Sequence, residues 1–417
     1  MKLSYIGIKI FIVTIMFTAL SLFLQVLPLS TAPYFEKTLF LHSSTFIYLT
    51  SVFFISYSIM QVPGGIFLDK YGIRKILPIF IGLTSIGVML FWYSSNSYMI
   101  LASRFIAGIG CSIGYIASIY VAAKFFSPRR LPMLIGIIEA ASEIGTLSAA
   151  NPLTYLIERF GWSLVGVFIS AFCVLLCILA VICMKQLANY PQEVAPKTTF
   201  MEYIKNIPIM LKNKTLLALF VYSFSTWLVI MSFAGFWLNS YLQTMHHYSA
   251  ITSLHCIQIY WISFIISSIM IGFFIKSGKF AKMALIFLAL LGFSAYSYMF
   301  IPILFDYSNI LLVIISGGIS AAGVTIAFSL IPHFVKPEQC GSAIALNNTF
   351  IVLGGYTGQV LFATLLQKFD VNDYIHIVGD SHINHHYYSA LIIYVFFTLV
   401  GLIAALTITF SKEPIVN

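Results

Sequence analysis

The stretch that decides the fold reads GGIFLDKYGIRK, from Gly64 to Lys75, and it joins two long apolar segments. Gly65 places a small residue where two helices can approach each other closely. Gly72 can adopt the positive φ angle that a tight reversal of the chain requires. Asp69 lies where the second apolar segment ends, and cations follow it. The stretch therefore predicts a specialised turn between two membrane-spanning helices.

The composition of the chain indicates a membrane protein. Hydrophobic residues make up 60% of the 417 residues and charged residues 8%, and the mean hydropathy is +0.97. Because a soluble domain carries about 25% charged residues, lipid is the expected surrounding. The net charge of +9 does not indicate a nucleic-acid partner, since the cations are spread over short loops and form no stripe. The six cysteines show no metal-ligand spacing, and no disulfide framework is expected.

Twelve apolar segments are each long enough to cross the hydrocarbon core of a bilayer. The predicted spans are 6–32, 44–67, 76–93, 98–126, 131–156, 163–184, 215–242, 250–275, 283–304, 309–335, 341–366 and 388–410. The first span has too long an apolar run for a signal peptide, so it is predicted to remain as a helix. The predicted fold class is an all-α membrane protein with twelve transmembrane helices.

The cations between the spans predict the orientation of the chain. Sixteen lysines and arginines fall on one side of the predicted spans, and only Lys37, Arg159 and Lys368 fall on the other. Short cytoplasmic loops carry an excess of such residues, so both termini are predicted to be cytoplasmic. The predicted location is a bacterial inner membrane.

One long connection divides the spans into two groups of six. The predicted domains are an N-terminal six-helix bundle over 1–184, a cytoplasmic linker over 185–214 and a C-terminal six-helix bundle over 215–417. Within the linker, the segment from Thr199 to Lys212 alternates apolar and polar residues, which predicts a position along the membrane surface. Pro208 argues against a long uninterrupted helix there.

The two halves of the chain are related at one fixed offset of 209 residues. This offset superposes the fourth and fifth spans on the tenth and eleventh without a gap. It pairs Gly108 with Gly317, Gly114 with Gly323, Phe125 with Phe334, Pro128 with Pro337, Gly145 with Gly354, and Phe160 with Phe369. Together these matches indicate a duplication. Duplicated bundles are a common plan of membrane transporters, which bind solute between the repeats near the membrane midplane.

The turn resembles a motif of the major facilitator superfamily, G-x-x-x-D-[RK]-x-G-x-[RK]-[RK]. The motif positions are occupied by Gly65, Asp69, Lys70, Gly72, Arg74 and Lys75. Two further motifs of the family are matched by Arg104-x-x-x-Gly108-x-Gly110 and by Phe160-Gly161-Trp162. The chain is similar to this family over about residues 6–410. Many drug and cation antiporters of the family carry a Gly-Pro pair in the fifth helix, whereas this chain reads EAASEIGTLSAANP there, which disfavours multidrug antiport.

The resemblance implies a conformational switch in the six motif residues. In the resembling family the turn braces the cytoplasmic side against the second half of the chain while the outer side is open. Asp69 is therefore expected near the start of the eleventh span, around Gly341 and Ser342, where a helix N-terminus attracts a carboxylate. An ordinary cytoplasmic loop would explain the cations of the turn but not the glycines around one acid.

Three ionisable side chains lie well inside the predicted spans: Arg104, Glu139 and Glu143. Such side chains usually face a cavity or a partner. Gln25 falls at a depth similar to that of Arg104 and is a predicted hydrogen-bond partner. A guanidinium beside a cavity suits a carboxylate or another anion as solute. In the alternative, neighbouring side chains and backbone carbonyls satisfy Arg104, which then holds the first bundle together.

Glu139 and Glu143 lie four residues apart and share one face of the fifth span. Two carboxylates one helical turn apart in a low dielectric do not both ionise readily, which favours a role in proton coupling. The 209-residue offset places Glu139 opposite Asn348, so Asn347 and Asn348 are predicted to face the first half at matching depth. Interhelical hydrogen bonding is the alternative role of the two asparagines.

Four aromatic side chains fall well inside their spans and are candidates for the lining of a solute cavity: Tyr115, Trp227, Tyr260 and Tyr356. Packing or lipid contact is the alternative for each of them. The outer segment 376–386 is rich in histidine, a composition found in metal-binding tracts. Its spacing matches no standard site, so no metal and no other cofactor is predicted.

The predicted function is secondary transport of a small polar organic solute, with organic anions as one candidate class, by alternating access. Protons are the predicted coupling ion, lipid is the predicted surrounding and a monomer is the predicted functional unit. Because no phosphate-binding glycine loop with its lysine is present, ATP-driven pumping is disfavoured. A passive facilitator or a drug or metabolite exporter is the alternative within this fold. Alternatives of other classes are a transporter-like receptor and a membrane-embedded enzyme, although no nucleophile or metal constellation accompanies the glutamates.

Overall fold

The computed structural model describes residues 2–39, 43–187, 200–275, 278–300, 307–370 and 381–409. Within these residues, twelve helices are long and apolar enough to cross a membrane, as the sequence predicts. The chain divides into two compact units, which are described separately below. The first unit comprises Met1–Ile207 with Val335–Leu346, and the second comprises Pro208–Phe334 with Asn347–Asn417.

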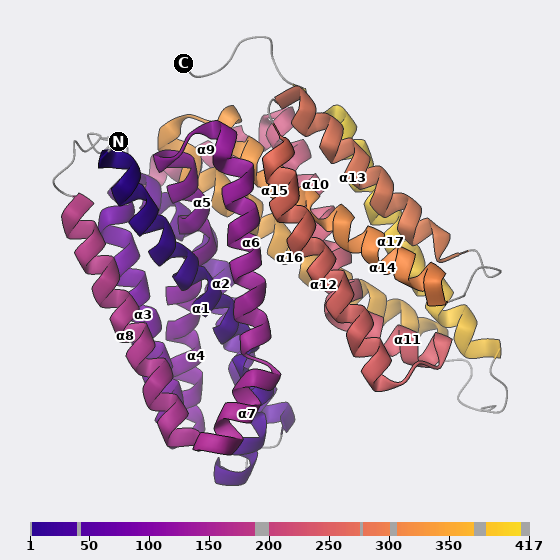
Figure 1. The fold of residues 1–417 in the computed structure, drawn as a ribbon, viewed down its shortest axis with the longest axis horizontal. Coiled ribbons are helices and arrows are strands. Elements are labelled where there is room, and N and C mark those ends of the chain that lie inside the picture. The colour runs from indigo at the N-terminus through magenta and orange to yellow at the C-terminus, as the bar shows by residue number, and fades with distance from the viewer. Residues whose placement is uncertain are drawn as a thin grey trace. The chain divides into compact units, whose positions relative to one another are not determined.

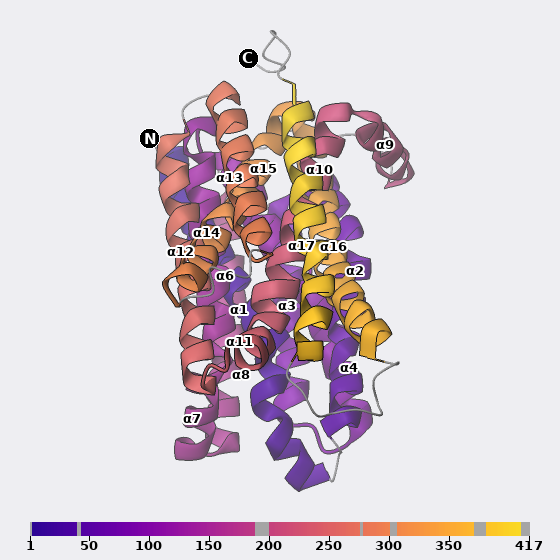
Figure 2. The ribbon, with the colours of Figure 1, turned by 90° about the vertical axis from the view of Figure 1, so that its right-hand side faces the viewer.

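The first unit contains the first six spanning segments, coloured indigo to magenta in Figures 1 and 2. Its helices are α1 (Lys2–Leu39), α2 (Ser43–Tyr71), α3 (Ile73–Trp92), α4 (Ser97–Cys111), α5 (Gly114–Phe125), α6 (Leu131–Ser148), α7 (Asn151–Phe160) and α8 (Trp162–Leu187). The helix α4 packs against α2 and α3, and α1 packs against α5 and α6. The buried rings of Phe17, Phe53 and Phe91 lie in its apolar core.

The second unit follows the linker helix α9 (Phe200–Lys212), which crosses the boundary between the units. Its helices are α10 (Lys214–Ser232), a π-helix over Phe233–Trp237, α11 (Leu238–His246), α12 (Ala250–Phe274), α13 (Gly278–Tyr298), α14 (Tyr307–Ala321), α15 (Gly323–Leu330), α16 (Cys340–Asp370) and α17 (Ser381–Thr407). The start of α16, as far as Leu346, belongs to the first unit. The helix α17 packs against α10 and α13, and α14 packs against α12 and α13.

The internal repeat appears in the structure at the predicted offset. The helix α6 follows a 3-10 turn over Pro128–Arg130, and α16 follows a 3-10 turn over Pro337–Gln339, which is 209 residues later. The fourth and tenth spans are both interrupted, and their second pieces begin at Gly114 and Gly323. The duplication therefore extends to the breaks within the helices.

The structure corrects the predicted extent of the fifth span, which was expected to continue to residue 156. Instead α6 ends at Ser148, and the separate helix α7 begins at Asn151. Pro152 occupies the first turn of α7. A proline suits that place because the first turn of a helix needs no N–H donor and φ near −65° is already helical.

The structure also corrects the effect expected of Pro208. The helix α9 is continuous over 13 residues with Pro208 inside it. Proline removes one hydrogen bond to the carbonyl four residues earlier, which here belongs to Ile204. Ile204 is exposed, so that carbonyl can be hydrated and the helix can continue.

Candidate functional site

Asp69 lies in the last turn of α2 and binds the first residues of α16 within the first unit. The backbone N–H groups of Gly341 and Ser342 donate to its two carboxylate oxygens, each at 2.7 Å. The Ser342 hydroxyl donates to Oδ2 at 2.6 Å. The first N–H groups of a helix lack helical partners, and the helix dipole favours an anion at that end. The contact that the resemblance implies is therefore present.

The two glycines of the turn have separate structural roles. Gly72 has a φ angle of +74°, as predicted for the reversal of the chain. Gly65 lies so close to α16 that a Cβ atom there would be 2.6 Å from the Gly341 carbonyl oxygen and would overlap the Ala345 side chain. Gly65 therefore permits the close approach that brings Asp69 to its donors.

The three cations of the turn take no part in the hydrogen bonds of Asp69 to Gly341 and Ser342. Arg74 and Lys75 are exposed. The Lys70 ammonium lies 5.2 Å from the centre of the Tyr71 ring. Their positions suit a charged membrane–water boundary, in which exposed lysines and arginines face the headgroups and solvent.

Arg104 on α4 lies in the core of the first unit and is 1% exposed. Its Nη1 donates to the Leu24 carbonyl at 2.8 Å, and its Nε donates to the Thr50 carbonyl at 3.5 Å. Its guanidinium carbon lies 4.4 Å from the centre of the Phe53 ring and 5.9 Å from that of Phe91. The side chain therefore joins α1, α2, α3 and α4, which supports the structural alternative for its role.

The predicted hydrogen bond between Arg104 and Gln25 is wrong for the residues that the structure describes. The acceptor is the backbone carbonyl of Leu24, while Gln25 is only half-buried. Leu24 precedes Pro28 by four residues within α1. Because proline has no N–H, the Leu24 carbonyl lacks its usual helical donor, and the guanidinium takes that place.

We expect Arg104→Lys to lower the stability of the first unit, because lysine cannot reach both carbonyls with a planar fork. Loss of one charge-assisted hydrogen bond corresponds to about 1.5–3 kcal/mol. Thermal unfolding of the purified variant measures the effect. The matched control is Arg159→Lys, because Arg159 is exposed and its Nη1 bonds only the Tyr155 hydroxyl. Equal unfolding temperatures for the two variants would contradict a structural role of Arg104.

The two glutamates on α6 are both buried but differ in their contacts. The Tyr115 hydroxyl on α5 donates to Glu139 Oε1. Glu143 lies one helical turn further along α6, and within the described residues no hydrogen bond or ion pair joins it. Glu139 therefore has a dedicated donor for a carboxylate oxygen, whereas the part of the chain that the structure describes supplies none to Glu143.

The two predicted asparagines occupy successive positions of α16. Asn347 is fully buried, and neither atom of its amide has a partner among the described residues. Asn348 is also buried but takes part in an interaction. Because buried polar groups are nearly always paired, the open amide of Asn347 is the stronger candidate for a ligand contact.

The four aromatic candidates fall into different surroundings. Tyr115 binds Glu139 as described above. Tyr260 is buried, and its hydroxyl lies 3.1 Å from that of Tyr296. Trp227 is half-buried, and Tyr356 is 68% exposed. Only Tyr115 is thus brought directly to another predicted residue.

The side chains of the histidine-rich segment 376–386 lie outside the described residues. Among the side chains that the structure does describe, no group of three or more His, Cys, Asp or Glu residues could hold a metal ion.

Comparison with protein families gives a match to the Major Facilitator Superfamily over residues 10–359. The chain belongs to this family. The chain is also similar to the uncharacterized transporter YybO of Bacillus subtilis (strain 168), with 21% identity over 131 residues. That match covers 31% of this chain and only 30% of the length of YybO.

Two solved structures of the superfamily have the same fold. The human organic anion transporter MFSD10 is 14% identical, with a TM-score of 0.71 over 97% of this chain and 99% of that chain. The proton:xylose symporter XylE is 15% identical, with a TM-score of 0.63 over 97% and 95% of the two chains. These likenesses confirm the predicted fold class of two six-helix bundles. As a member of the superfamily, the chain is an integral multi-pass membrane protein of a transporter family.

Polar residues that sequence reasoning missed also lie inside this facilitator fold. Gln61 on α2 is fully buried. On α1, the Thr18 hydroxyl donates to the Gly114 carbonyl and also lies 2.8 Å from the Ser118 hydroxyl. Thr14 and Ser21 share its buried face. Their spacing of three and four residues within an apolar span was the signal that could have identified them.

Proposed function

We propose that the protein is a proton-coupled secondary transporter of a small polar organic solute that works by alternating access. The observation that carries the coupling is the unequal environment of the two buried acids on α6. Tyr115 donates to Glu139, whereas no donor reaches Glu143 among the described residues. Burial of an ionised carboxylate without a partner is unfavourable, so Glu143 is suited to carry a proton and to release it when its surroundings change.

The solute is proposed to be polar and neutral rather than anionic. The buried cation of the spanning helices, Arg104, binds two backbone carbonyls through Nε and Nη1 and packs on two aromatic rings, and only its Nη2 has no partner among the described residues. By contrast, the amide of Asn347 has both its donor and its acceptor free among the described residues. An amide can pair with hydroxyl, amide or carbonyl groups of a solute, but it supplies no countercharge. An organic anion would have to pair with the remaining Nη2 group of Arg104, which is buried in the core of the first unit.

The contact of Asp69 is proposed to act as the conformational switch of this transporter. It fastens the first turn of α16 to the end of α2, while the remainder of α16 belongs to the second unit. Both termini are proposed to be cytoplasmic in a bacterial inner membrane, with a monomer as the functional unit. The proposed division into bundles is 1–184 and 215–417, with 185–214 as the linker.

Transport and coupling can be tested together in proteoliposomes that contain a pH-sensitive dye. A panel of neutral polyols, neutral amino acids and carboxylates is added outside, and internal pH and solute uptake are recorded. Saturable uptake accompanied by internal acidification is expected with a neutral solute. Binding without uptake would support a receptor instead, and chemical conversion of the solute would support an enzyme.

A further inference from the structure

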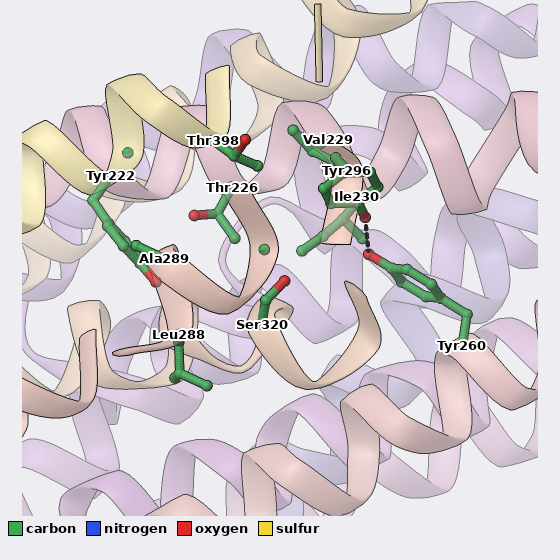
Figure 3. A pocket seen from close by; sticks show the side chains of 12 residues that line it. Tyr222, Thr226, Val229, Ile230, Tyr260, Leu288, Ala289, Tyr296, Ser320 and Thr398 are labelled. Atoms are coloured by element: carbon green, nitrogen blue, oxygen red, sulfur yellow. Dashed lines mark hydrogen bonds between the residues drawn. The ribbon is translucent and has the colours of Figure 1, made fainter. Parts of the chain in front are cut away.

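The second unit contains a small cavity between α10, α12, α13, α14 and α17, shown in Figure 3. Its volume is about 20 Å³. Six hydroxyl-bearing side chains line it: Tyr222, Thr226, Tyr260, Tyr296, Ser320 and Thr398. A space of this size holds one water-sized molecule.

Two of the lining hydroxyls offer acceptor oxygens to the cavity. Ser320 donates its proton to the Gly317 carbonyl at 2.7 Å, and Thr398 donates its proton to the Tyr394 carbonyl at 2.7 Å. A hydroxyl has one donor proton and two acceptor lone pairs. Because both protons are used within their own helices, Ser320 and Thr398 have only lone pairs left to offer to a further partner.

The pair of Tyr260 and Tyr296 supplies a hydrogen-bond donor to the cavity. The hydroxyls of Tyr260 and Tyr296 share one hydrogen bond of 3.1 Å, drawn as a dashed line in Figure 3. That bond uses one of their two protons, so one donor remains for the cavity. Both tyrosines are fully buried, and an unused hydroxyl proton in such a place is unfavourable.

We propose that this cavity binds one ordered water molecule that links α12 and α13 to α14 and α17. The water donates to Ser320 and Thr398 and accepts from the tyrosine pair, which gives it three partners. Buried waters in proteins typically have about three such partners. Gly292 leaves the space open, because a Cβ atom there would lie 2.9 Å from Ser320 Oγ.

A monovalent cation is the competing occupant. The cavity is lined by neutral hydroxyl, aliphatic and glycine residues, and no carboxylate is among them. A buried ion without a countercharge is strongly unfavourable, whereas water needs only donors and acceptors. The chemistry of the lining therefore favours water.

The direct test is radiolytic labelling of the reconstituted protein in water enriched in oxygen-18. Hydroxyl radicals formed from a bound water label the side chains beside it. We expect oxygen-18 on the buried rings of Tyr260 and Tyr296 in the unsubstituted protein, and loss of that label in Gly292→Ala, whose added methyl group fills the cavity. Unlabelled tyrosines in the unsubstituted protein would show that the cavity is dry and would overturn the proposal.

A matched pair of serine variants provides the second readout. Ser320→Ala removes an acceptor of the water. Ser329→Ala is the control, because Ser329 is also buried and donates to a carbonyl three residues earlier, that of Ile326, at 2.7 Å, but it does not line the cavity. We expect Ser320→Ala to lower the unfolding temperature by roughly 2–4 °C more than Ser329→Ala. Equal shifts would overturn the proposal. The unfolding temperature is also compared in Na⁺, K⁺ and choline salts. If Na⁺ raises it in the unsubstituted protein and this increase disappears in Ser320→Ala, the cavity binds a cation instead.

If Ser320→Ala does not fold, a threonine pair replaces it. Thr398→Val removes the other acceptor, and Thr364→Val is its control. Thr364 likewise donates to the carbonyl four residues back, at 2.8 Å, but it is exposed. The same difference in unfolding temperature is expected, and its absence contradicts the proposal in the same way.

Discussion

Replacement of Asp69 by asparagine is expected to slow solute transport at least tenfold while the protein remains folded. The Asp69 carboxylate accepts three hydrogen bonds from Gly341 and Ser342. Asparagine keeps one acceptor oxygen. Its NH₂ group replaces the other oxygen, so one backbone N–H of α16 would face a second donor instead of an acceptor. A hydrogen bond to a charged group contributes about 1.5–3 kcal/mol, and 1.36 kcal/mol already corresponds to a factor of ten. The switch equilibrium is therefore expected to shift by more than tenfold.

The initial rate of uptake into proteoliposomes, at matched amounts of incorporated protein, measures this effect. Ser342→Ala removes one of the three donors and should produce an intermediate loss. Glu338→Gln removes an exposed charge close to the same end of α16 and should leave the rate unchanged. All variants should remain folded at the temperature of the assay, and solute affinity should be nearly the same in all of them. Wild-type uptake by Asp69→Asn would remove the switch role.

The Asp69 contact was predictable because a sequence motif carries it, and the structure places the carboxylate on the expected residues. The partner of Arg104 was predictable in principle. Pro28 lies four residues after Leu24, so it leaves the Leu24 carbonyl without its helical donor. Depth along a helix pointed to Gln25 instead, because depth alone does not identify which groups lack a partner.

The pairing of Tyr115 with Glu139 was not predictable from the sequence. Periodicity assigns each residue to a face of its own helix, but it does not determine which face of α5 meets which face of α6. The π-helical turn at Phe233–Trp237 was missed for a different reason. It changes the hydrogen-bond register of a span without changing the apolar composition from which the span is predicted. The partners of the predicted residues therefore depend on tertiary packing, which the sequence pattern does not determine.

Replacement of Glu143 by glutamine is expected to abolish accumulation driven by a pH gradient and to preserve exchange of solute across the membrane. Glu143 lies roughly 18 Å along α6 from its start, by helical rise, which is close to the middle of a hydrocarbon core of about 30 Å. Glutamine resembles the protonated acid in size and neutrality but cannot release a proton. A transporter with this variant can still change its orientation with solute bound, so counterflow exchange continues. Net uptake against a gradient requires the proton and is lost.

Two neighbouring variants distinguish Glu143 from a general requirement for acids on α6. Tyr115→Phe removes the donor to Glu139, so it should change the dependence of uptake on pH while coupling persists. Glu139→Gln should weaken transport less selectively, because it disturbs both the Tyr115 contact and the charge next to Glu143. The measurement is uptake with an imposed inward proton gradient, compared with uptake at equal pH and with uptake after a protonophore. Accumulation by the unsubstituted protein that ignores both the gradient and the protonophore would contradict proton coupling, and a passive facilitator or a sodium-coupled carrier would then replace it.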